Sequence, residues 1–345
     1  MKCINNKRID RKRQQRQRRK KRQARAAAIM IMLVLLISAG ALGGFLLWDS
    51  SQNYTLSYEE TTYNKALYQG ELFAQDLCVS SEEVPLDGFE PDSELHAAGL
   101  FDLSEEKVLC GYKIYDKVYP ASTTKILTAY LALKYGNVDD TVTVSEHATD
   151  FGWDASVAGL KPGDTLTLYD LLCGLMIRSG NDCATAIAEY ISESEEAFAE
   201  LMNKEAAALG ATGTHFTNPH GLHEDDHYTT AYDLYLIFNE CIKDQRFVEI
   251  ISMDSYTADI TATDGTVRAE TWTPTNYYSA GITVAPENVR VIGGKTGTEN
   301  LAGNCLILFD ENTEGKPYIS VIMGAPDKGV LYEEMNELFS AFRSV

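Results

Sequence analysis

The chain has 345 residues, of which 45% are hydrophobic and 23% are charged, a composition typical of a globular protein with an ample core. Its net charge of −20 is unevenly divided, because residues 1–25 carry 13 Lys or Arg and one acidic residue, whereas the remainder carries a charge of −32. An exterior this acidic excludes nucleic-acid binding by the main part of the chain.

An uncharged, mostly apolar stretch of 23 residues, 26–48, follows the basic residues. That length is enough to span a bilayer as a helix, and flanking basic residues stay on the cytoplasmic side. We therefore predict a basic cytoplasmic tail at residues 1–25, a transmembrane signal anchor at residues 26–48, and a single-pass membrane protein whose remaining residues lie outside the cytoplasm. A cleaved signal peptide is the alternative, since residues 39–41 are small. The apolar residues that continue to Trp48 favour the uncleaved anchor.

Residues 49–72 are polar and lack strong periodicity, so we predict an extracytoplasmic stalk there and a folded domain at residues 73–345. Six of the seven cysteines fall in that domain. An even number outside the cytoplasm permits disulfides, but no close repeated spacing imposes a framework. Most of these cysteines are expected to be small buried hydrophobic residues, and their pairing stays open.

The patterns in the domain predict strands at both ends and helices between them. A first strand is expected near residues 77–79, followed by a β-hairpin formed by residues 97–101 and 107–111. A helix is expected after Pro120, followed by a short strand at 141–144. Four further helices are expected at 166–177, with Asp164 or Thr165 as its cap, and at 182–191, 194–209 and 230–241. From residue 256 the pattern changes to strands, of which three are joined by short turns and must be antiparallel: 289–297, 305–309 and 318–323. An amphipathic helix at 331–342 ends the chain, so the fold class is α+β.

The helix after Pro120 contains the first candidate catalytic pair. Pro120 presets a backbone angle suited to a helix start, so Ser122 lies in the first turn and Lys125 lies over the same face three residues on. A lysine amine held there could take the serine proton if burial and a second cation keep it neutral. Ser-x-x-Lys alone is a weak signal, because such spacings often arise by chance.

Two more motifs follow in a fixed order. Ser179-Gly180-Asn181 begins 57 residues after Ser122, and a Lys-Thr-Gly-Thr stretch begins at Lys295, a further 116 residues on. This trio is the signature of penicillin-binding proteins and serine β-lactamases. Three matches in order are far more specific than any one of them.

From about Glu71 to its end, the chain resembles the serine-type D-alanyl-D-alanine carboxypeptidases, the low-molecular-mass penicillin-binding proteins of peptidase family S11. The segments 218–222, Asn-Pro-His-Gly-Leu, and 227–234, His-Tyr-Thr-Thr-Ala-Tyr-Asp-Leu, are also similar to that family's motifs. The resemblance implies a β-lactamase/transpeptidase-like fold, in which an antiparallel sheet is flanked by helices and joined to a helical subdomain. Fuller members add a β-rich domain and an amphipathic anchoring helix after it. This sequence shows neither, and the N-terminal anchor is expected to replace them.

The resemblance also implies an activity: removal of the terminal D-alanine from peptidoglycan stem peptides in bacteria, through an acyl-enzyme that β-lactam antibiotics also form. Ser122 is the implied nucleophile and Lys125 its general base. Ser179 is implied to relay a proton toward the leaving D-alanine, and Asn181 to hydrogen-bond the substrate amide. No cofactor is implied.

The third motif supplies the implied substrate clamp. Lys295 and Thr296 hold the terminal carboxylate, and Gly297 lets the backbone approach closely. The N–H groups of Ser122 and Thr298 form the expected oxyanion hole. The charge of Lys295, together with burial and the positive helix end, should hold the pKa of the Lys125 amine several units below that of a free lysine.

Other functions compete with this interpretation. A β-lactamase shares the nucleophile and clamp, but no Glu-x-x-Leu-Asn segment lies between Ser179 and Lys295, which disfavours the class A type. A non-hydrolytic penicillin sensor would need a larger transmitter than residues 1–25, and a peptidoglycan endopeptidase stays open. Seven side chains between residues 215 and 227 could also form a metal site, but the resemblance instead assigns residues 218–222 to a turn and predicts that His220 and His223 are exposed in a loop. These side chains are His215, His220, His223, Glu224, Asp225, Asp226 and His227.

Overall fold

The computed structural model describes residues 76–341 and scattered positions between residues 16 and 38. The chain divides into two units, Met1–Phe73 and Ala74–Val345. The described positions of the first unit are helical and exposed. Among all described residues, no helix combines the length and apolar character needed to cross a bilayer. The predicted span at 26–48 lies largely outside the described residues, and the predicted stalk at 49–72 lies wholly outside them.

A five-stranded antiparallel sheet forms one part of the second unit, in the order β2-β1-β9-β8-β7. The hairpin of the first two strands and the meander of the last three were both predicted, and both are confirmed. β7 lies at an edge, with one side of its backbone unpaired in the sheet. The strands are β1 (Ala97–Asp102), β2 (Lys107–Tyr112), β7 (Val289–Glu299), β8 (Gly303–Asn312) and β9 (Pro317–Ala325).

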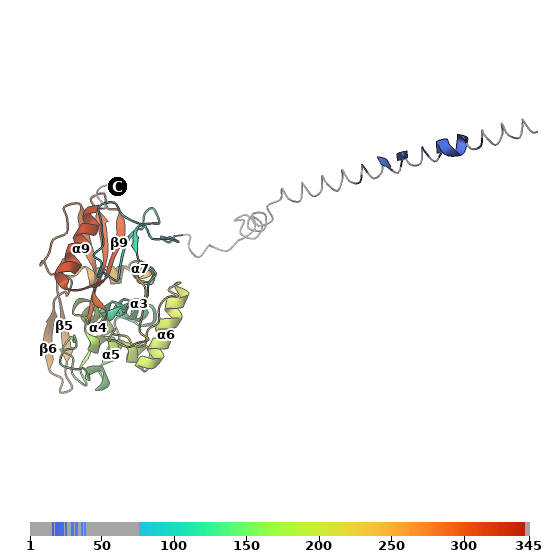
Figure 1. Ribbon diagram of the computed structural model, residues 1–345. Helices are drawn as coiled ribbons and strands as arrows, with labels where there is room; N and C mark the ends of the chain where they lie inside the picture. Colours follow the sequence, from blue (N-terminus) through green and yellow to red (C-terminus); the bar gives the residue numbers. More distant parts are fainter. Residues whose placement is uncertain are drawn as a thin grey trace, which may run out of the picture. The chain divides into compact units, whose positions relative to one another are not determined.

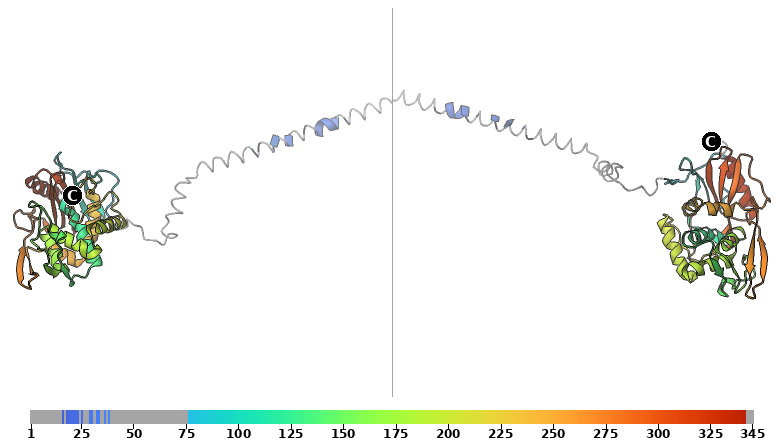
Figure 2. Two further views of the ribbon diagram at one scale, coloured as in Figure 1. Left: turned by 90° about the horizontal axis from the view of Figure 1, so that it is seen from below. Right: turned by 180° about the vertical axis from the view of Figure 1, so that it is seen from behind.

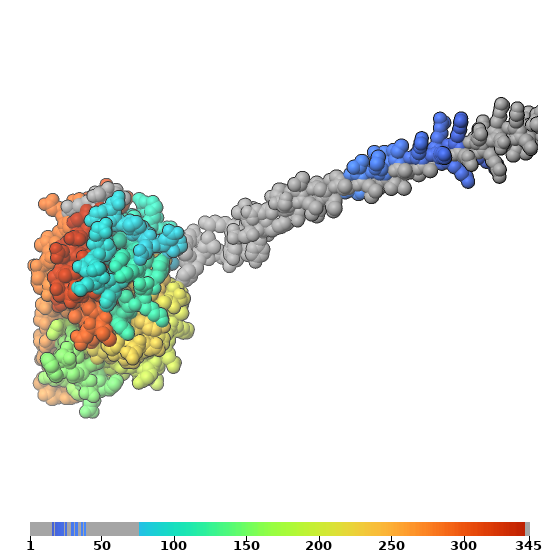
Figure 3. Space-filling view, in the orientation of Figure 1, coloured from blue at the N-terminus to red at the C-terminus, as the bar shows by residue number. Residues whose placement is uncertain are grey.

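Helices cover both faces of this sheet. Alternate residues of a strand point to opposite faces, and in the central strands the side chains on both faces are apolar. Phe101, Ile307 and Val321 pack into the larger core on the helical side. Leu100 and Leu308 pack into a second core beneath α9 (Lys328–Ala341), the predicted C-terminal helix. Part of α9, in red, is visible on the molecular surface in Figure 3. Two apolar faces therefore fix the sheet between helices.

The helices between β2 and β7 lie on the other face of this sheet from α9, and α7 packs directly against β1 and β9 (Figures 1 and 2). A second sheet of four short strands, β3-β4-β5-β6, lies at their side. The helices are the 3₁₀ helices η1 (Ala121–Thr124) and η2 (His147–Thr149), and α3 (Lys125–Tyr135), α4 (Leu168–Ile177), α5 (Asn181–Ser192), α6 (Glu195–Ala208), α7 (Ala231–Cys241) and α8 (Gln245–Ile251). The strands are β3 (Thr141–Thr143), β4 (Thr165–Thr167), β5 (Tyr256–Thr261) and β6 (Val267–Trp272).

The helix predicted over 166–177 begins later than expected. Thr167, not Asp164 or Thr165, is its N-cap, because the Thr167 side chain accepts from the Asp170 N–H while the Asp170 carboxylate accepts from the Thr167 N–H. The residues before it form β4, which pairs with β3 and touches β5 at a single pair, Thr165 with Thr261. This second sheet and α8 were not predicted as such.

The strand predicted near residues 77–79 is wrong. Cys78 instead lies in an irregular segment that is held by two tyrosine side chains of α7. Its N–H donates to the Tyr235 hydroxyl at 2.8 Å, and its carbonyl accepts from the Tyr232 hydroxyl at 2.8 Å. All six cysteines that the structure describes are free and buried, as expected for small hydrophobic residues: Cys78, Cys110, Cys173, Cys183, Cys241 and Cys305.

Candidate active site

Ser122 and Lys125 lie where a 3₁₀ turn becomes an α-helix. Pro120 precedes η1, and Lys125 begins α3, so the predicted helix start after Pro120 is confirmed with a tighter first turn. The Lys125 side chain is fully buried, and its Nζ lies 3.0 Å from the Ser122 Oγ. Two acceptors complete its surroundings: the Asn181 Oδ1 at 2.7 Å and the His220 carbonyl oxygen at 2.6 Å. Lys125 is therefore held inside the protein by polar contacts and is not a solvated surface lysine.

Burial is the main cause that holds the pKa of the Lys125 amine well below its ordinary value. The charge of Lys295 acts in the same direction, as the sequence predicted, while the carboxylate of Asp182 opposes it. Burial also lowers the pKa of Lys295, to about 7. The site thus holds two lysines that lose their protons far more readily than a lysine in water.

Ser179 sits in the tight turn between α4 and α5. Its backbone has a φ of 64°, a left-handed conformation that is uncommon for a residue with a side chain. The Lys295 Nζ donates to the Ser179 Oγ at 2.9 Å, across 116 residues of sequence. Asn181 then begins α5, with its N–H donating to the Ser156 carbonyl at 2.8 Å. The turn therefore delivers both polar side chains of the second motif to the first and third.

The edge strand β7 carries the third motif past η1. An added Cβ on Gly297 would lie 2.9 Å from the Pro120 carbonyl oxygen and 3.1 Å from the Ser122 nitrogen, so only glycine fits without displacing this backbone. The Thr296 carbonyl accepts from the Lys295 Nζ at 2.8 Å. The exposed Thr298 donates its hydroxyl to the Asn304 Oδ1 at 3.1 Å.

The turn formed by residues 218–222 packs against the serine from the other side. The Asn218 Oδ1 accepts from the Gly221 N–H at 2.7 Å, and Gly221 has a φ of 88°. An added Cβ there would lie 1.9 Å from the Ala121 carbonyl oxygen. This contact explains the glycine of the motif, and it presents the His220 carbonyl to Lys125.

The expectation that His220 is exposed is wrong, because its ring is buried and only 7% of the residue is accessible. His223 is half-buried rather than exposed. His227 is buried as well, and its Nδ1 accepts from the Thr217 N–H at 3.0 Å while its Nε2 lies 2.8 Å from the Thr124 hydroxyl. Within residues 76–341, no three His, Cys, Asp or Glu side chains are placed to hold a metal ion.

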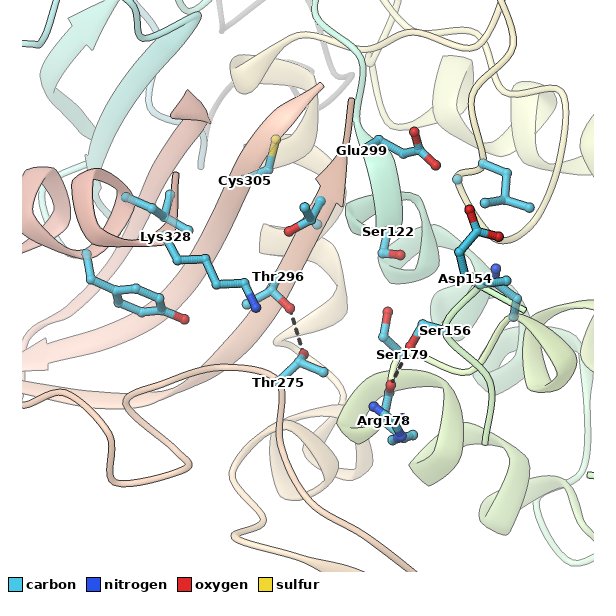
Figure 4. A pocket seen from close by; sticks show the side chains of 18 residues that line it. Ser122, Asp154, Ser156, Arg178, Ser179, Thr275, Thr296, Glu299, Cys305 and Lys328 are labelled. Carbon is cyan, nitrogen blue, oxygen red and sulfur yellow. Dashed lines mark hydrogen bonds between the residues drawn. The ribbon is translucent and has the colours of Figure 1, made fainter. Parts of the chain in front are cut away.

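The three motifs meet at one cavity of about 370 Å³ (Figure 4). All the predicted site residues line it except the two buried lysines, which lie beneath it. Sequence reasoning missed Thr275, whose hydroxyl lies 2.6 Å from the Thr296 hydroxyl and enters the cavity. It also missed Tyr332 of α9 and the segment 154–156. Nothing in their local sequence marks them, since only the fold brings them to the motifs.

The fold and these contacts define a β-lactamase/transpeptidase-like protein with a serine–lysine pair. The chain belongs to the D-alanyl-D-alanine carboxypeptidase family, peptidase family S11, whose model matches residues 88–327.

Curated relatives and solved structures agree with this family. The chain is 42% identical over 155 residues to D-alanyl-D-alanine carboxypeptidase DacF of Bacillus subtilis, covering 44% of this chain and 39% of that protein. It is 33% identical over 259 residues to DacC of Escherichia coli, covering 72% of this chain and 61% of that protein. The chain therefore matches less than two thirds of the length of either relative.

Two solved structures share the fold. The DD-transpeptidase of Streptomyces K15 matches with a TM-score of 0.68 and 26% identity, covering 74% of this chain and 99% of that one. The D-alanyl-D-alanine carboxypeptidase of Mycobacterium tuberculosis matches with a TM-score of 0.66 and 27% identity, covering 77% of this chain and 95% of that one.

Proposed function

We propose that this protein is a penicillin-sensitive serine D-Ala-D-Ala carboxypeptidase that removes the terminal D-alanine from peptidoglycan stem peptides through an acyl-enzyme. The observation that carries this proposal is the arrangement around the Lys125 Nζ. Its two shortest contacts go to the Asn181 and His220 oxygens, which can only accept, while its longest contact, 3.0 Å, goes to the Ser122 hydroxyl. A neutral amine has two N–H donors for the first two contacts. Its lone pair then faces the serine proton.

Acylation follows from this geometry. Lys125 takes the proton as the Ser122 Oγ attacks the carbonyl carbon of the penultimate D-alanine. The Ser122 N–H, at the start of η1, and the Thr298 N–H, on the edge strand, are the proposed donors to the oxyanion. The close approach of Gly297 to the Ser122 nitrogen supports this pairing, because it brings β7 alongside the serine.

Ser179 and Lys295 act in the departure of the leaving group. Because the Lys295 Nζ donates to the Ser179 Oγ, the hydroxyl hydrogen of Ser179 is free to turn toward the substrate nitrogen. As the C–N bond breaks, Ser179 gives that proton to the amine of the leaving D-alanine and is resupplied by Lys295. The terminal carboxylate is clamped by Lys295 and the hydroxyls of Thr296 and Thr275. Water then adds its hydroxide to the ester carbonyl carbon. The Ser122 Oγ leaves with the proton that Lys125 holds, and the other proton of the water passes through Ser179 to Lys295, which restores both lysines and frees Ser122.

Mass spectrometry of muropeptides incubated with the purified full-length chain tests this proposal. Pentapeptide stems ending in D-Ala-D-Ala should each lose one alanine residue. Conversion of cross-linked dimers to monomers would instead establish an endopeptidase. Rapid turnover of penicillin with intact stems would establish a β-lactamase, and stable penicillin binding without any hydrolysis would establish a sensor.

The substrate clamp should depend on pH through Lys295. A lysine is charged below its pKa, so with a pKa of about 7 Lys295 loses its charge, and its hold on a carboxylate, as the pH rises. We expect the KM for a D-Ala-D-Ala peptide to rise above about pH 7 as this charge is lost. Steady-state kinetics across pH check this. A Lys295→Arg variant cannot deprotonate and should bind more weakly overall but lose this pH dependence; an unchanged profile would contradict the assignment.

We also propose that residues 1–48 anchor the protein in the membrane with its C-terminus outside, supported by the charge of +12 before 23 uncharged residues. Protease added to intact protoplasts should digest the domain while leaving a membrane-bound fragment of about five kilodaltons, the mass of roughly 48 residues. Protection of the domain, or a mature N-terminus at Leu42, would contradict the anchor.

A further inference from the structure

The charged side chains of the catalytic cavity are divided between its two ends. Four ionised residues line it: Asp154, Arg178, Glu299 and Lys328. Figure 4 shows Lys328 beside Thr296 and Thr275, and Arg178 below Ser179. The carboxylates of Asp154 and Glu299 both lie on the opposite side of Ser122 from Lys328. The cavity is therefore cationic where the proposed clamp holds the terminal carboxylate, and anionic beyond the nucleophile.

The edge strand gives this polarity a direction along the substrate. Four consecutive residues of β7, from Thr296 to Glu299, line the cavity. An extended peptide can lie along such an unpaired edge, and it advances about 3.3 Å per residue. With the terminal carboxylate at Thr296, the residue two positions earlier is about 7 Å further along. Its side chain then has Glu299 on one wall and Asp154 on the other.

The loop that carries Asp154 is anchored to the helical part of the domain, and the Glu299 carboxylate has a backbone partner. The loop that carries Asp154 is bound to α5, because the buried Asp182 carboxylate accepts from the N–H groups of Ala158, Gly159 and Leu160 at 2.8–3.0 Å. The Glu299 Oε2 accepts from the Asn300 N–H at 3.1 Å. Neither Asp154 nor Glu299 has a cationic partner within salt-bridge distance among the described residues. Two negative charges are thus held at the acyl side of the cavity without a protein counterion.

We infer that Asp154 and Glu299 are specificity residues that select peptides whose residue two before the terminal D-alanine carries a free primary amine. This inference rests on the proposed function. An ammonium on a flexible aliphatic stem reaches both walls and supplies the missing counterion. The same amine loses its charge when it is acylated, as it is in a cross-link. The enzyme therefore acts preferentially on strands whose acceptor amine is still unused.

Three synthetic peptides isolate this charge. Nα-acetyl-lysyl-D-Ala-D-Ala carries the free amine, its Nε-acetyl derivative has the amine neutralised, and its Nε-succinyl derivative is anionic. Exposed ion pairs are individually weak, so we expect kcat/KM for the purified full-length chain to favour the free amine over the acetylated peptide by roughly three- to tenfold. Raising the salt concentration should shrink this ratio.

Variants of the chain assign the preference to the two residues. Asp154→Asn combined with Glu299→Gln should bring the free-amine to acetyl ratio to about one, and Asp154→Lys should favour the succinyl peptide. Glu200→Gln combined with Glu249→Gln removes the same charge from exposed positions outside the cavity and should keep the parent ratio. Cleavage of the amine and acetyl peptides at equal rates, or a preference that survives the double cavity variant, overturns the inference and leaves the carboxypeptidase function standing. Failure to cleave any of the three overturns the proposed function instead.

Discussion

Replacing Ser122 by alanine should abolish covalent labelling of the purified chain by a fluorescent penicillin. The β-lactam amide stands in for the D-Ala-D-Ala amide, and the β-lactam carboxylate stands in for the terminal carboxylate that Lys295 and Thr296 are proposed to clamp. Only a nucleophile at this point of the cavity can open the ring, so the acylation rate should fall by at least about a thousandfold. Gel fluorescence after denaturation measures the covalent product directly.

A second serine of the same cavity provides the control. Ser156 also lines the cavity, but its hydroxyl donates to the Arg178 carbonyl at 3.1 Å rather than meeting a lysine. Ser156→Ala should therefore keep stoichiometric labelling. If the Ser122→Ala protein were still labelled stoichiometrically, peptide mapping would identify another nucleophile, and the assignment of Ser122 would have to be abandoned.

The sequence could predict the Ser122–Lys125 pair because its geometry is local. A proline before a helix start and a spacing of three residues are enough to place the two side chains on one face. Ser179 and Lys295 are different, since they meet across 116 residues. No local pattern shows that contact, and it was anticipated through the resemblance to a family whose motifs occur in this order.

What the sequence could not show depends on tertiary packing. The His220 ring was expected to be exposed because residues 218–222 were assigned to a turn in a loop. The ring is instead buried, and the His220 carbonyl accepts from Lys125, 95 residues earlier in the sequence. Thr275 lies in an irregular segment with no motif, and it enters the site only because its hydroxyl meets Thr296. β4 is three residues long, too short for an alternating pattern to separate it from the start of α4.

The second large effect is expected on replacing Lys125, the proposed general base. Lys125→Arg keeps a positive charge beside Ser122 but cannot deprotonate in the working pH range. General-base catalysis contributes about 10²–10⁴-fold, so acylation by penicillin should slow by that factor. Stopped-flow or quenched labelling measures the rate, and circular dichroism confirms folding. Lys134→Arg on the same helix, where the lysine is 41% exposed and paired with Glu205, should acylate at the parent rate.

Lys125 is fully buried, and arginine has a larger side chain. The test must therefore separate the effect of a larger side chain from the effect of losing a proton acceptor. Lys125→Met fills nearly the same volume without an amine, so it should acylate as slowly as the arginine variant. It also removes a donor from Asn181 and His220, which should lower the melting temperature modestly. Loss of acylation in both variants, with folding retained, assigns the proton transfer to the amine of Lys125. If either variant acylated at near the parent rate, the lone pair facing Ser122 would not be the base, and another group would have to activate the nucleophile.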